Sequence, residues 1–420
     1  MQADDLKLSR VEDYCLTFLE DLPYVYHCHH YNLFHDQTVD DALGEDAGRE
    51  LRMVASREAT YPLIQRCCAT AGALTPAERL ETAAALFRWM GHGDLEFAVQ
   101  AQGGEVRGEH LHYGLSWREK YGSGVRRTTP ADAFGAGFAA AATEVAFNLP
   151  AGELAVEETH CVALREPECD IHLAPGGKRD LGRIRSERAE ILSRLGATFG
   201  GLDEERIAAI GAGLADFVRG AASDERGLIR AFNVYVTRHL AAYYNTSIYR
   251  AVRQVEARMP QSSPAAEWLF REAGHVCVFN TFGNVLLSPE WEGLIGPLSG
   301  LAEDTLSYCC AIARGLGFGR WTLAEHVPGK RLVLRTPATY ESIFDLCNHG
   351  ASTRGRCYIL QGAAVALMVL AQKVPWTESP SLTPEFYASL FSAGPLPWKV
   401  EETRCIAKGD SYCEAVVTEV

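Results

Sequence analysis

Residues 401–413 contain the clearest metal-binding pattern in the sequence, because a carboxylate and two thiols follow one another at short, fixed spacing. Glu402, Cys405 and Cys413 fall on and after a predicted strand, and the strand after the turn brings Cys413 back beside the other two. Zinc takes four ligands from cysteine, histidine and carboxylate in a tetrahedron, so one ligand is missing. Cys357, at the start of the preceding predicted helix, is the natural fourth. The pattern therefore predicts a zinc site, and free buried thiols are the simpler alternative.

The same pattern occurs earlier in the chain, at residues 157–169, and both copies read E-E-T-x-C-x7-C. Five identical letters in one register indicate a duplicated unit. Cys357 precedes Gly362 by five residues, and the residue that precedes Gly137 by five is Asp132. In the first copy Asp132 therefore replaces the helix cysteine. Aspartate can bind zinc, so this copy holds either a mixed-ligand site or an altered one, and His160 or His172 could substitute. The candidate metal ligands of the first copy are Asp132, Glu158, Cys161 and Cys169.

Histidines collect in the first copy, and their positions in the second copy carry other residues. Three of them fall between residues 29 and 35, and two more are two residues apart on a predicted strand, so that both would face the same side. Such histidines with a nearby carboxylate are what a non-haem iron, copper or catalytic zinc centre needs, and an axial haem ligand is a further option. The plainer alternative is that several of them cap helices or lie on the surface. The candidate catalytic residues are His29, His30, His35, His110 and His112.

Hydrophobic periodicity and turn residues predict the elements that position these groups. In the first copy we expect an amphipathic helix over 10–26, helices over 38–90, a hairpin from Gly91 whose second strand is 105–115, a helix over 131–147 and a closing strand pair. Residues 177–262 are charged and predict a helical connector. In the second copy we match His275–Phe282 with His27–Phe34, Gly317–Gly319 with Gly91–Gly93, and a helix over 357–373 with the helix over 131–147.

The segment Cys357–Gly362 followed by E-x-x-C-x7-C resembles the 4-vinyl reductase domain. Domains of that family serve as effector-binding modules of phenol-type transcriptional activators and occur in bacteriochlorophyll-pathway proteins. The resemblance implies a bacterial α/β (α+β) fold with an antiparallel sheet packed by helices, a structural zinc and a hydrophobic pocket beside it. It covers each of the two copies but not the middle of the chain. The predicted division is a His-rich domain over 1–176, a connector over 177–262 and a zinc-holding domain over 263–420.

Composition and charge exclude several classes of partner. The 420 residues carry a net charge of −14, which argues against nucleic acid and against an anionic membrane surface. No apolar run reaches the roughly 18 residues of a membrane span. The N-terminus lacks the basic and apolar regions of an export signal. The 13 cysteines are therefore expected as thiols or metal ligands in a cytoplasmic protein.

Two functions fit these features. The first is a metal-dependent enzyme that acts on a small aromatic or hydrophobic molecule in the first copy, with zinc, iron, copper or haem there and a structural zinc in the second. The alternative is a non-catalytic sensor or carrier that binds such a molecule. The absence of an ATPase or DNA-binding segment, together with the histidine asymmetry, favours the enzyme. A homodimer is compatible with either.

Overall fold

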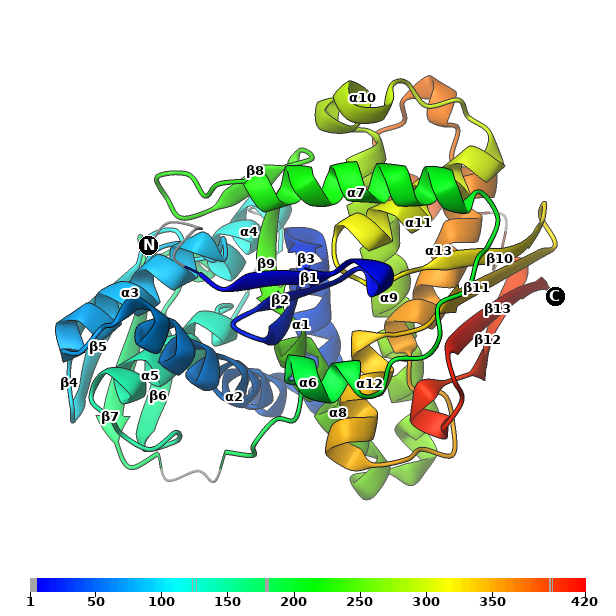
Figure 1. Cartoon of the computed structure of the whole chain (residues 1–420). Helices are drawn as coiled ribbons and strands as arrows, with labels where there is room; N and C mark the ends of the chain where they lie inside the picture. The colour runs from blue at the N-terminus through cyan, green and yellow to red at the C-terminus, as the bar shows by residue number, and fades with distance from the viewer. Residues whose placement is uncertain (1–5, 123, 126, 178–180, 393, 395) are drawn as a thin grey trace.

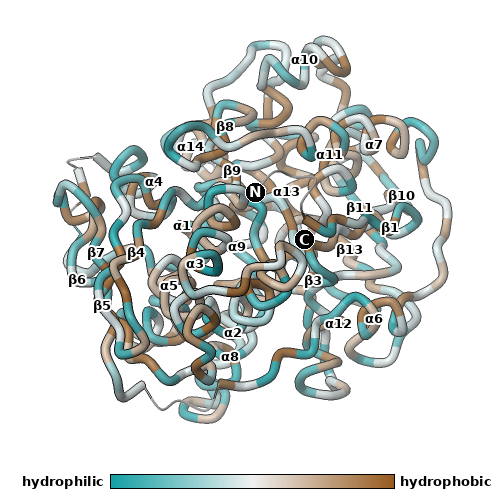
Figure 2. Tube along the Cα trace, turned by 60° about the vertical axis from the view of Figure 1, so that its left-hand side comes forward, coloured by the Kyte–Doolittle hydropathy of each residue, from teal (hydrophilic) through white to brown (hydrophobic). Residues whose placement is uncertain are grey.

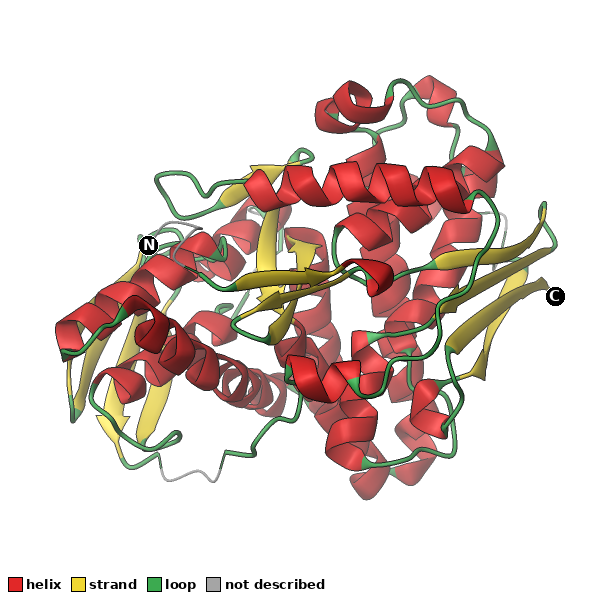
Figure 3. Cartoon of the chain, in the orientation of Figure 1, coloured by secondary structure: helices red, strands yellow, loops and turns green. Residues whose placement is uncertain are grey.

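The computed structural model describes residues 6–420 except 123, 126, 178–180, 393 and 395. Residues 1–5, which belong to the N-terminal stretch predicted not to be an export signal, lie outside the described residues. The chain has a mixed α/β fold in which helices pack around three antiparallel sheets (Figures 1 and 3). One four-stranded sheet lies at each end of the molecule, and the five-stranded sheet lies between them (Figure 3). No helix in the described part is both long and apolar enough to cross a membrane.

Apart from α10 and α14, which only the second half has among the described residues, one order of elements occurs twice along the chain. After β1 (Leu8–Val11), the first half consists of β2 (Leu16–Leu19), β3 (Leu22–Cys28), α1 (His29–Leu43), α2 (Glu45–Ala71), α3 (Pro76–Trp89), β4 (Glu96–Gln100), β5 (Gly103–Gly108), α4 (His112–Tyr121), α5 (Ala133–Ala146), β6 (Leu154–His160) and β7 (Cys169–Pro175). Two connecting helices follow, α6 (Arg188–Leu192) and α7 (Glu204–Gly220). The second half consists of β8 (Ile229–Ala231), β9 (Val234–Leu240), α8 (Ala241–Arg258), α9 (Ser263–Leu286), α10 (Pro289–Ile295), α11 (Ala302–Gly315), β10 (Thr322–Val327), β11 (Arg331–Thr336), α12 (Tyr340–His349), α13 (Tyr358–Lys373), α14 (Pro384–Ser389), β12 (Trp398–Arg404) and β13 (Cys413–Glu419).

The two outer sheets repeat each other in detail. Their strand orders are β4-β5-β7-β6 in the first half and β10-β11-β13-β12 in the second. Each has a register shift at the same place, after Glu158 in β6 and after Glu402 in β12. A bulge of this kind re-aims the side chains that follow it. The duplicated sequence pattern therefore corresponds to a duplicated local geometry, as predicted.

The central sheet joins the halves through the antiparallel pair β3 and β9, in the order β1-β2-β3-β9-β8. Cys28 and Leu240 end these two strands, so equivalent positions are 240 − 28 = 212 residues apart. Tyr26 pairs with Arg238, which is 238 − 26 = 212 residues further on. Because each of these residues pairs with its own equivalent, a pseudo-two-fold axis passes between them. The halves are therefore related as the subunits of a symmetric dimer are.

Each central strand also hydrogen-bonds to the other half, at the residue that follows α11 or at the residue that follows α3. The Tyr26 N–H donates to the Leu316 carbonyl at 3.0 Å, and the Arg238 N–H donates to the Met90 carbonyl at 2.9 Å. The glycine that follows has φ of +84° at position 91 and +86° at Gly317. A Cβ at Gly317 would lie 2.6 Å from the Thr17 hydroxyl oxygen, which is too close. Glycine is thus required twice over, by backbone conformation and by the approach of the partner strand.

Three sequence predictions about the elements are wrong and one match is confirmed. Residues 10–26 form β1, β2 and part of β3 instead of a helix, and the predicted helical connector over 177–262 contains the strands β8 and β9. The stretch His275–Phe282 lies within α9, whereas His27–Phe34 spans the end of β3 and the start of α1, so those stretches are not equivalent. The match of Gly317–Gly319 with residues 91–93 is confirmed, because both follow the helix before a hairpin. Strand and helix share short apolar patterns, and here tertiary pairing decides between them.

The hydrophobic core runs through both halves. Figure 2 shows hydrophobic stretches spread over helices and strands in both halves of the molecule. The helices α5 and α13, which carry the first and second copies of the predicted helix, are buried along most of their length. One contiguous core includes buried residues from both halves and from α7 between them. The halves therefore share an interior as well as a sheet.

Replacing Gly317 with alanine is expected to destabilise the junction between the halves. Alanine at this position would have to adopt a left-handed backbone conformation, and its Cβ would displace Thr17, whose hydroxyl donates to the Tyr24 carbonyl. We therefore expect a loss of about 2–4 kcal/mol in the free energy of unfolding. Gly329→Ala is the matched control, since Gly329 has φ +71° with nothing within 4 Å, and about 1 kcal/mol is expected there. Denaturant unfolding measures both, and equal losses would show that the close approach contributes nothing.

Candidate functional site

Two strands and one helix build the sulfur site of the second half, which we define as Cys357, Glu402, Cys405 and Cys413. Cys357 is the residue before α13, Glu402 precedes the bulge of β12, and Cys405 follows that strand. A single 3-10 turn, Ile406–Lys408, then reverses the chain so that Cys413 begins β13. The ligand atoms of all four residues lie within 4.8 Å of one another. The structure thus brings together the four residues expected from the sequence.

The geometry of this site fits a zinc ion. The Cys357 sulfur lies 3.4 Å from that of Cys413 and 4.0 Å from that of Cys405. Tetrahedral zinc with bonds of 2.3 Å to sulfur separates its sulfur ligands by about 3.8 Å. Glu402 Oε2 accepts hydrogen bonds from the Cys357 N–H and the Gln361 amide, while its buried Oε1 has no partner among the described residues. One carboxylate oxygen is therefore positioned by protein and the other is free to bind a metal.

Electrostatics point the same way. Burial raises the pKa of Glu402 well above its usual value, and the neighbouring Cys405 adds to the shift. Burial also raises the pKa of the Cys357 thiol, together with its contacts to the other two sulfurs. The cluster thus resists carrying several negative charges by itself. A divalent cation would remove that cost, because thiolates and carboxylates bind metals in their deprotonated forms.

The first half repeats three parts of this site. Glu158, Cys161 and Cys169 place their ligand atoms within 4.8 Å of one another, and the two sulfurs are 3.6 Å apart. Asp132 occupies the position of Cys357, but its carboxylate caps α5: Oδ1 accepts from the Gly135 N–H at 2.7 Å. Its Oδ2 accepts a hydrogen bond from the Tyr113 N–H at 3.2 Å. Asp132 is therefore not part of the close ligand group.

Three of the five histidines predicted to be catalytic lie on α1 and serve local contacts. The rings of His29 and His30 are 3.9 Å apart, and His29 Nδ1 accepts from the Tyr235 N–H at 3.3 Å. Burial lowers the pKa of His29 to about 4 and that of His30 to about 2. His35 is buried with its Nδ1 3.0 Å from Asp36. No three of the five predicted histidines place their ligand atoms within 4.8 Å of one another in the described part of the chain.

The prediction that His110 and His112 share one face of a strand is wrong. The strand β5 ends at Gly108, and α4 begins at His112. His110 lies before the helix, 3.9 Å from Asp94, with 32% of its side chain exposed, whereas His112 is buried. Within the described residues, the two sulfur groups are the sets of three or more His, Cys, Asp or Glu ligands found within 4.8 Å. A metal centre made by the five predicted histidines is therefore not assembled.

A different set of histidines meets in the interior, and we call His92, His112 and His239 the histidine cluster. The His92 ring lies 4.8 Å from that of His239 and 5.8 Å from that of His112, between ring centroids. All three are at most 1% exposed. His239 comes from β9 of the second half and reaches the first half through the β3–β9 pairing. Sequence reasoning missed it because it lies in the supposed connector, whereas His92 could have been noticed as the counterpart of Phe318.

Four ring nitrogens of the histidine cluster have no hydrogen-bond partner in the described part of the chain: both of His92, Nδ1 of His112 and Nδ1 of His239. Burial lowers the pKa of His92 and His239 well below the usual value, helped by the neighbouring imidazoles. Burial, with His29 nearby, lowers the pKa of His112 to about 3. The rings are thus neutral at pH 7, and each offers one donor and one acceptor. A buried polar atom without a partner costs about 1–3 kcal/mol, so four together indicate a missing partner.

Hydrogen bonds hold two of these rings in place. The Asn32 amide lies 2.9 Å from His112 Nε2, and the Asn32 carbonyl oxygen accepts from the Tyr244 hydroxyl. With the Asn32 NH2 donating, His112 Nε2 is the acceptor, and its unpaired Nδ1 carries the hydrogen. The Tyr113 hydroxyl lies 3.0 Å from His239 Nε2. The rings are therefore oriented by their paired nitrogens, which leaves the others available.

Aromatic side chains enclose the histidine cluster. The Phe134 ring is stacked 4.2 Å from His92 and lies 4.4 Å from His239. Tyr243 lies 4.8 Å from His239 and 5.2 Å from Phe134, edge to face with the latter. Phe87 adds a ring 5.4 Å from His92. The surroundings of the cluster are therefore aromatic and apolar, with imidazole edges between the rings.

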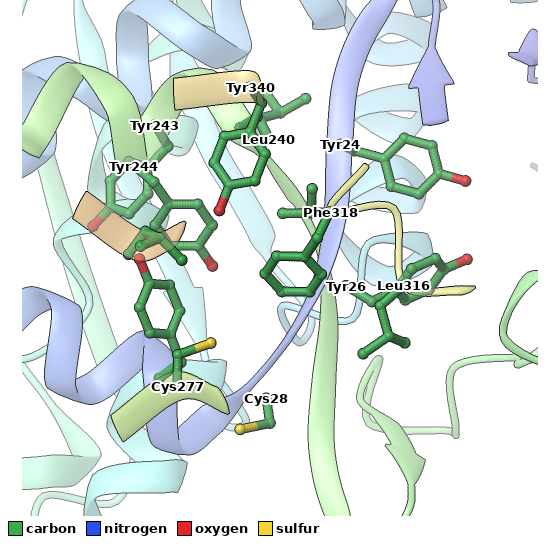
Figure 4. Close-up of a cluster of buried hydrophobic side chains, with 14 of the residues drawn as sticks. Tyr24, Tyr26, Cys28, Leu240, Tyr243, Tyr244, Cys277, Leu316, Phe318 and Tyr340 are labelled. Carbon is green, nitrogen blue, oxygen red and sulfur yellow. The ribbon is translucent and has the colours of Figure 1, made fainter. Parts of the chain in front are cut away.

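The equivalent region of the second half has one histidine in place of three. Here His27 of β3 contacts Phe318 at 4.8 Å and stacks on Tyr31 at 4.1 Å. Phe318 and Tyr340 take the positions of His92 and His112. Figure 4 shows Tyr244, Phe318 and Tyr340 gathered on one side of β3, with Tyr24 and Tyr26 across the strand. The two halves thus share a frame and differ in the number of imidazoles inside it.

Comparison with known proteins identifies no family. No family model matches the chain, and no curated protein matches it either. Among solved structures, the phenol-responsive sensory domain of the transcription activator PoxR with phenol is similar, with a TM-score of 0.34 and 18% identity over 42% of this chain and 88% of that one. A likeness at this level supports no inference about function. The resemblance of the motifs to the 4-vinyl reductase domain therefore stays a prediction.

Replacing Cys405 with serine is expected to remove zinc from the second half. The substitution leaves three ligands and an uncompensated buried carboxylate, so we expect one zinc ion fewer per chain and a loss of roughly 4 kcal/mol in the free energy of unfolding. Elemental analysis and denaturant unfolding measure the two effects. Cys309→Ala is the control, because Cys309 is a buried thiol on α11 outside both sulfur sites. Unchanged zinc content in Cys405→Ser would contradict the prediction.

Proposed function

We propose that this chain is a non-catalytic small-molecule-binding protein, a sensor or carrier, whose ligand lies at the histidine cluster. The observation that carries this proposal is the set of four unpaired ring nitrogens inside a fully buried aromatic cage. A zinc ion at the second-half sulfur site would tie β12 and β13 to α13 and have a structural role. The enzyme hypothesis is less well supported, because the five histidines on which it depended form no close ligand group in the described residues and only His112 belongs to the histidine cluster.

The difference between the halves supports this location. If the histidines were needed only for packing, the same frame in the second half would need them too. Phe318 and Tyr340 fill the equivalent positions there, with rings of similar size. Imidazole at position 92 therefore adds hydrogen-bonding capacity that its counterpart Phe318 lacks, whereas Tyr340, the counterpart of His112, also carries an unpaired polar atom. That capacity is a reasonable sign of binding, since buried polar groups are normally paired.

The chemistry of the cluster suggests the class of ligand. Neutral imidazoles can both donate to and accept from a hydroxyl group. A planar ring would stack on Phe134 or meet Tyr243 edge to face. An anionic ligand would meet uncharged histidines in the cluster, and burying its charge there would be costly. We therefore expect a small neutral aromatic molecule that carries a hydroxyl or similar group.

A neighbouring cavity is less suitable as the recognition site. It has a volume of about 220 Å³ and is lined by α2, by residues 181–187 and by Leu240 and Ala242 near the start of α8. Two of its acidic side chains are already in ion pairs, Glu58 with Arg250 and Glu187 with Arg66. The cavity thus offers mainly apolar volume beside the residues that follow His239, and it lacks the group of unpaired imidazole nitrogens found at the histidine cluster.

Binding of phenol, measured by isothermal titration calorimetry, tests the proposal. We expect saturable binding of phenol, and binding of toluene at least tenfold weaker, because toluene leaves the imidazoles unpaired. Benzoate should bind more weakly as well, owing to the cost of burying its charge. Equal affinities for phenol and toluene, or no saturable binding of phenol, would contradict the proposed site.

His92→Phe locates the site within the molecule. It reproduces the residue that the second half has at this position, so the fold should be retained, while the affinity for phenol should fall at least tenfold. His110→Ala is the matched control, since it removes an exposed histidine outside the cluster and should leave the affinity unchanged. Circular dichroism and the melting temperature confirm that each variant is folded. A His92→Phe protein that binds phenol normally would place the ligand elsewhere.

A further inference from the structure

The sulfur site of the first half differs from that of the second in the residues that close it. We propose that Glu158, Cys161 and Cys169 hold a second zinc ion with only three protein ligands, so that its fourth position takes an exchangeable water molecule or small anion. The inference concerns a different place from the histidine cluster and is independent of the ligand proposed there.

Three ligands are prepared in the same manner as in the second half. Glu158 Oε2 accepts from the Asp132 N–H at 2.9 Å, and the buried Oε1 has no hydrogen-bond partner in the described structure. The Cys161 sulfur accepts from the Ala131 N–H at 3.4 Å, and the Cys169 sulfur from the Val162 N–H at 3.3 Å. Backbone donors aimed at both sulfurs stabilise thiolates, which are the metal-binding form.

The sulfur spacing also fits a metal. The two sulfurs are 3.6 Å apart, close to the roughly 3.8 Å expected for two thiolates on tetrahedral zinc. A carboxylate oxygen of Glu158 lies within 4.8 Å of both sulfurs. An unpaired buried carboxylate oxygen beside two thiols is the same arrangement that Glu402 Oε1 has in the second half. The repetition of this detail after divergence of the surroundings indicates that the first half also binds a metal.

The fourth ligand is what the first half lacks. In the second half the position is filled by a third thiol, whose sulfur contacts the other two. In the first half Asp132 has both carboxylate oxygens bonded to backbone N–H groups, of Gly135 and Tyr113. Turning this carboxylate to a metal would break the cap of α5, which costs about 1 kcal/mol or more. The aspartate is therefore retained as a cap and leaves the coordination incomplete.

The first half also has a smaller side chain next to the sulfurs than the second half has. The third residue of α12 is Ser342, whose hydroxyl lies 3.3 Å from the Cys413 sulfur. The third residue of α4 is Gly114, and a Cβ there would lie 3.3 Å from both the Cys161 and the Cys169 sulfurs. The glycine leaves a space next to the sulfurs that a side chain would fill. Zinc sites that keep an open position exchange their fourth ligand, whereas sites closed by four protein ligands are structural.

Zinc stoichiometry and release kinetics of the full chain test the proposal. We expect two zinc ions per chain, one of which passes to the chromogenic chelator 4-(2-pyridylazo)resorcinol at least tenfold faster than the other. Cys161→Ser should remove the fast phase only. Asp132→Cys supplies the thiol that the second half has, and should slow the fast phase to the rate of the slow one. Two ions released at one slow rate by the unaltered chain would overturn the proposal.

Further arms separate the competing explanations. With Co²⁺ in both sites, azide should change the visible absorption spectrum of the unaltered chain and leave that of Asp132→Cys unchanged. Asp132→Asn keeps the oxygen that caps α5, and should retain the zinc affinity of the first site within twofold. A tenfold loss in Asp132→Asn would make Asp132 the fourth ligand. A single zinc ion per chain with a Cys161–Cys169 disulfide, detected by mass spectrometry after alkylation, would also overturn the open metal site.

Discussion

The pairing of β3 with β9 is the constraint on which the rest of the structure depends. It places Tyr26 against Arg238 on a pseudo-two-fold axis and brings each strand to the loop of the other half. The residues that follow in each strand, His27 and His239, then enter the opposite half. Loss of this pairing would leave each half without part of its interior. The close approach at Gly317 is a consequence of the same geometry.

Duplication explains why the two halves can be compared residue by residue. The frame is kept: the bulges in β6 and β12, the sulfur pairs and the glycines before each hairpin recur. The two halves differ at a few equivalent positions. Asp132 takes the place of Cys357, and His92 takes the place of Phe318. A frame stabilised by two similar cores tolerates such exchanges locally, because each changes few contacts. The first half therefore holds the less complete sulfur site and the richer set of unpaired imidazoles.

The sulfur site was predictable because its ligands are local in sequence. A strand, a tight turn and a second strand bring Glu402, Cys405 and Cys413 together within a few residues, and only Cys357 comes from further away. The histidines were not predictable in this way. His92, His112 and His239 come from three elements, and the last belongs to the other half. Two residues of spacing suggested that His110 and His112 share a strand face, but β5 ends before them.

The duplication, the mixed α/β class, the outer hairpins and the residues of the second sulfur site could all be predicted from the order of the residues. Each of these follows from local spacing or from comparison of one copy with the other. Only the tertiary structure decided that residues 10–26 and 229–240 are strands, that Asp132 caps a helix, and which histidines meet. The physical reason is that strand pairing and burial act between segments about 200 residues apart (240 − 28 = 212). The strand or helix propensity of a short segment does not depend on a partner strand that lies so far away in the sequence.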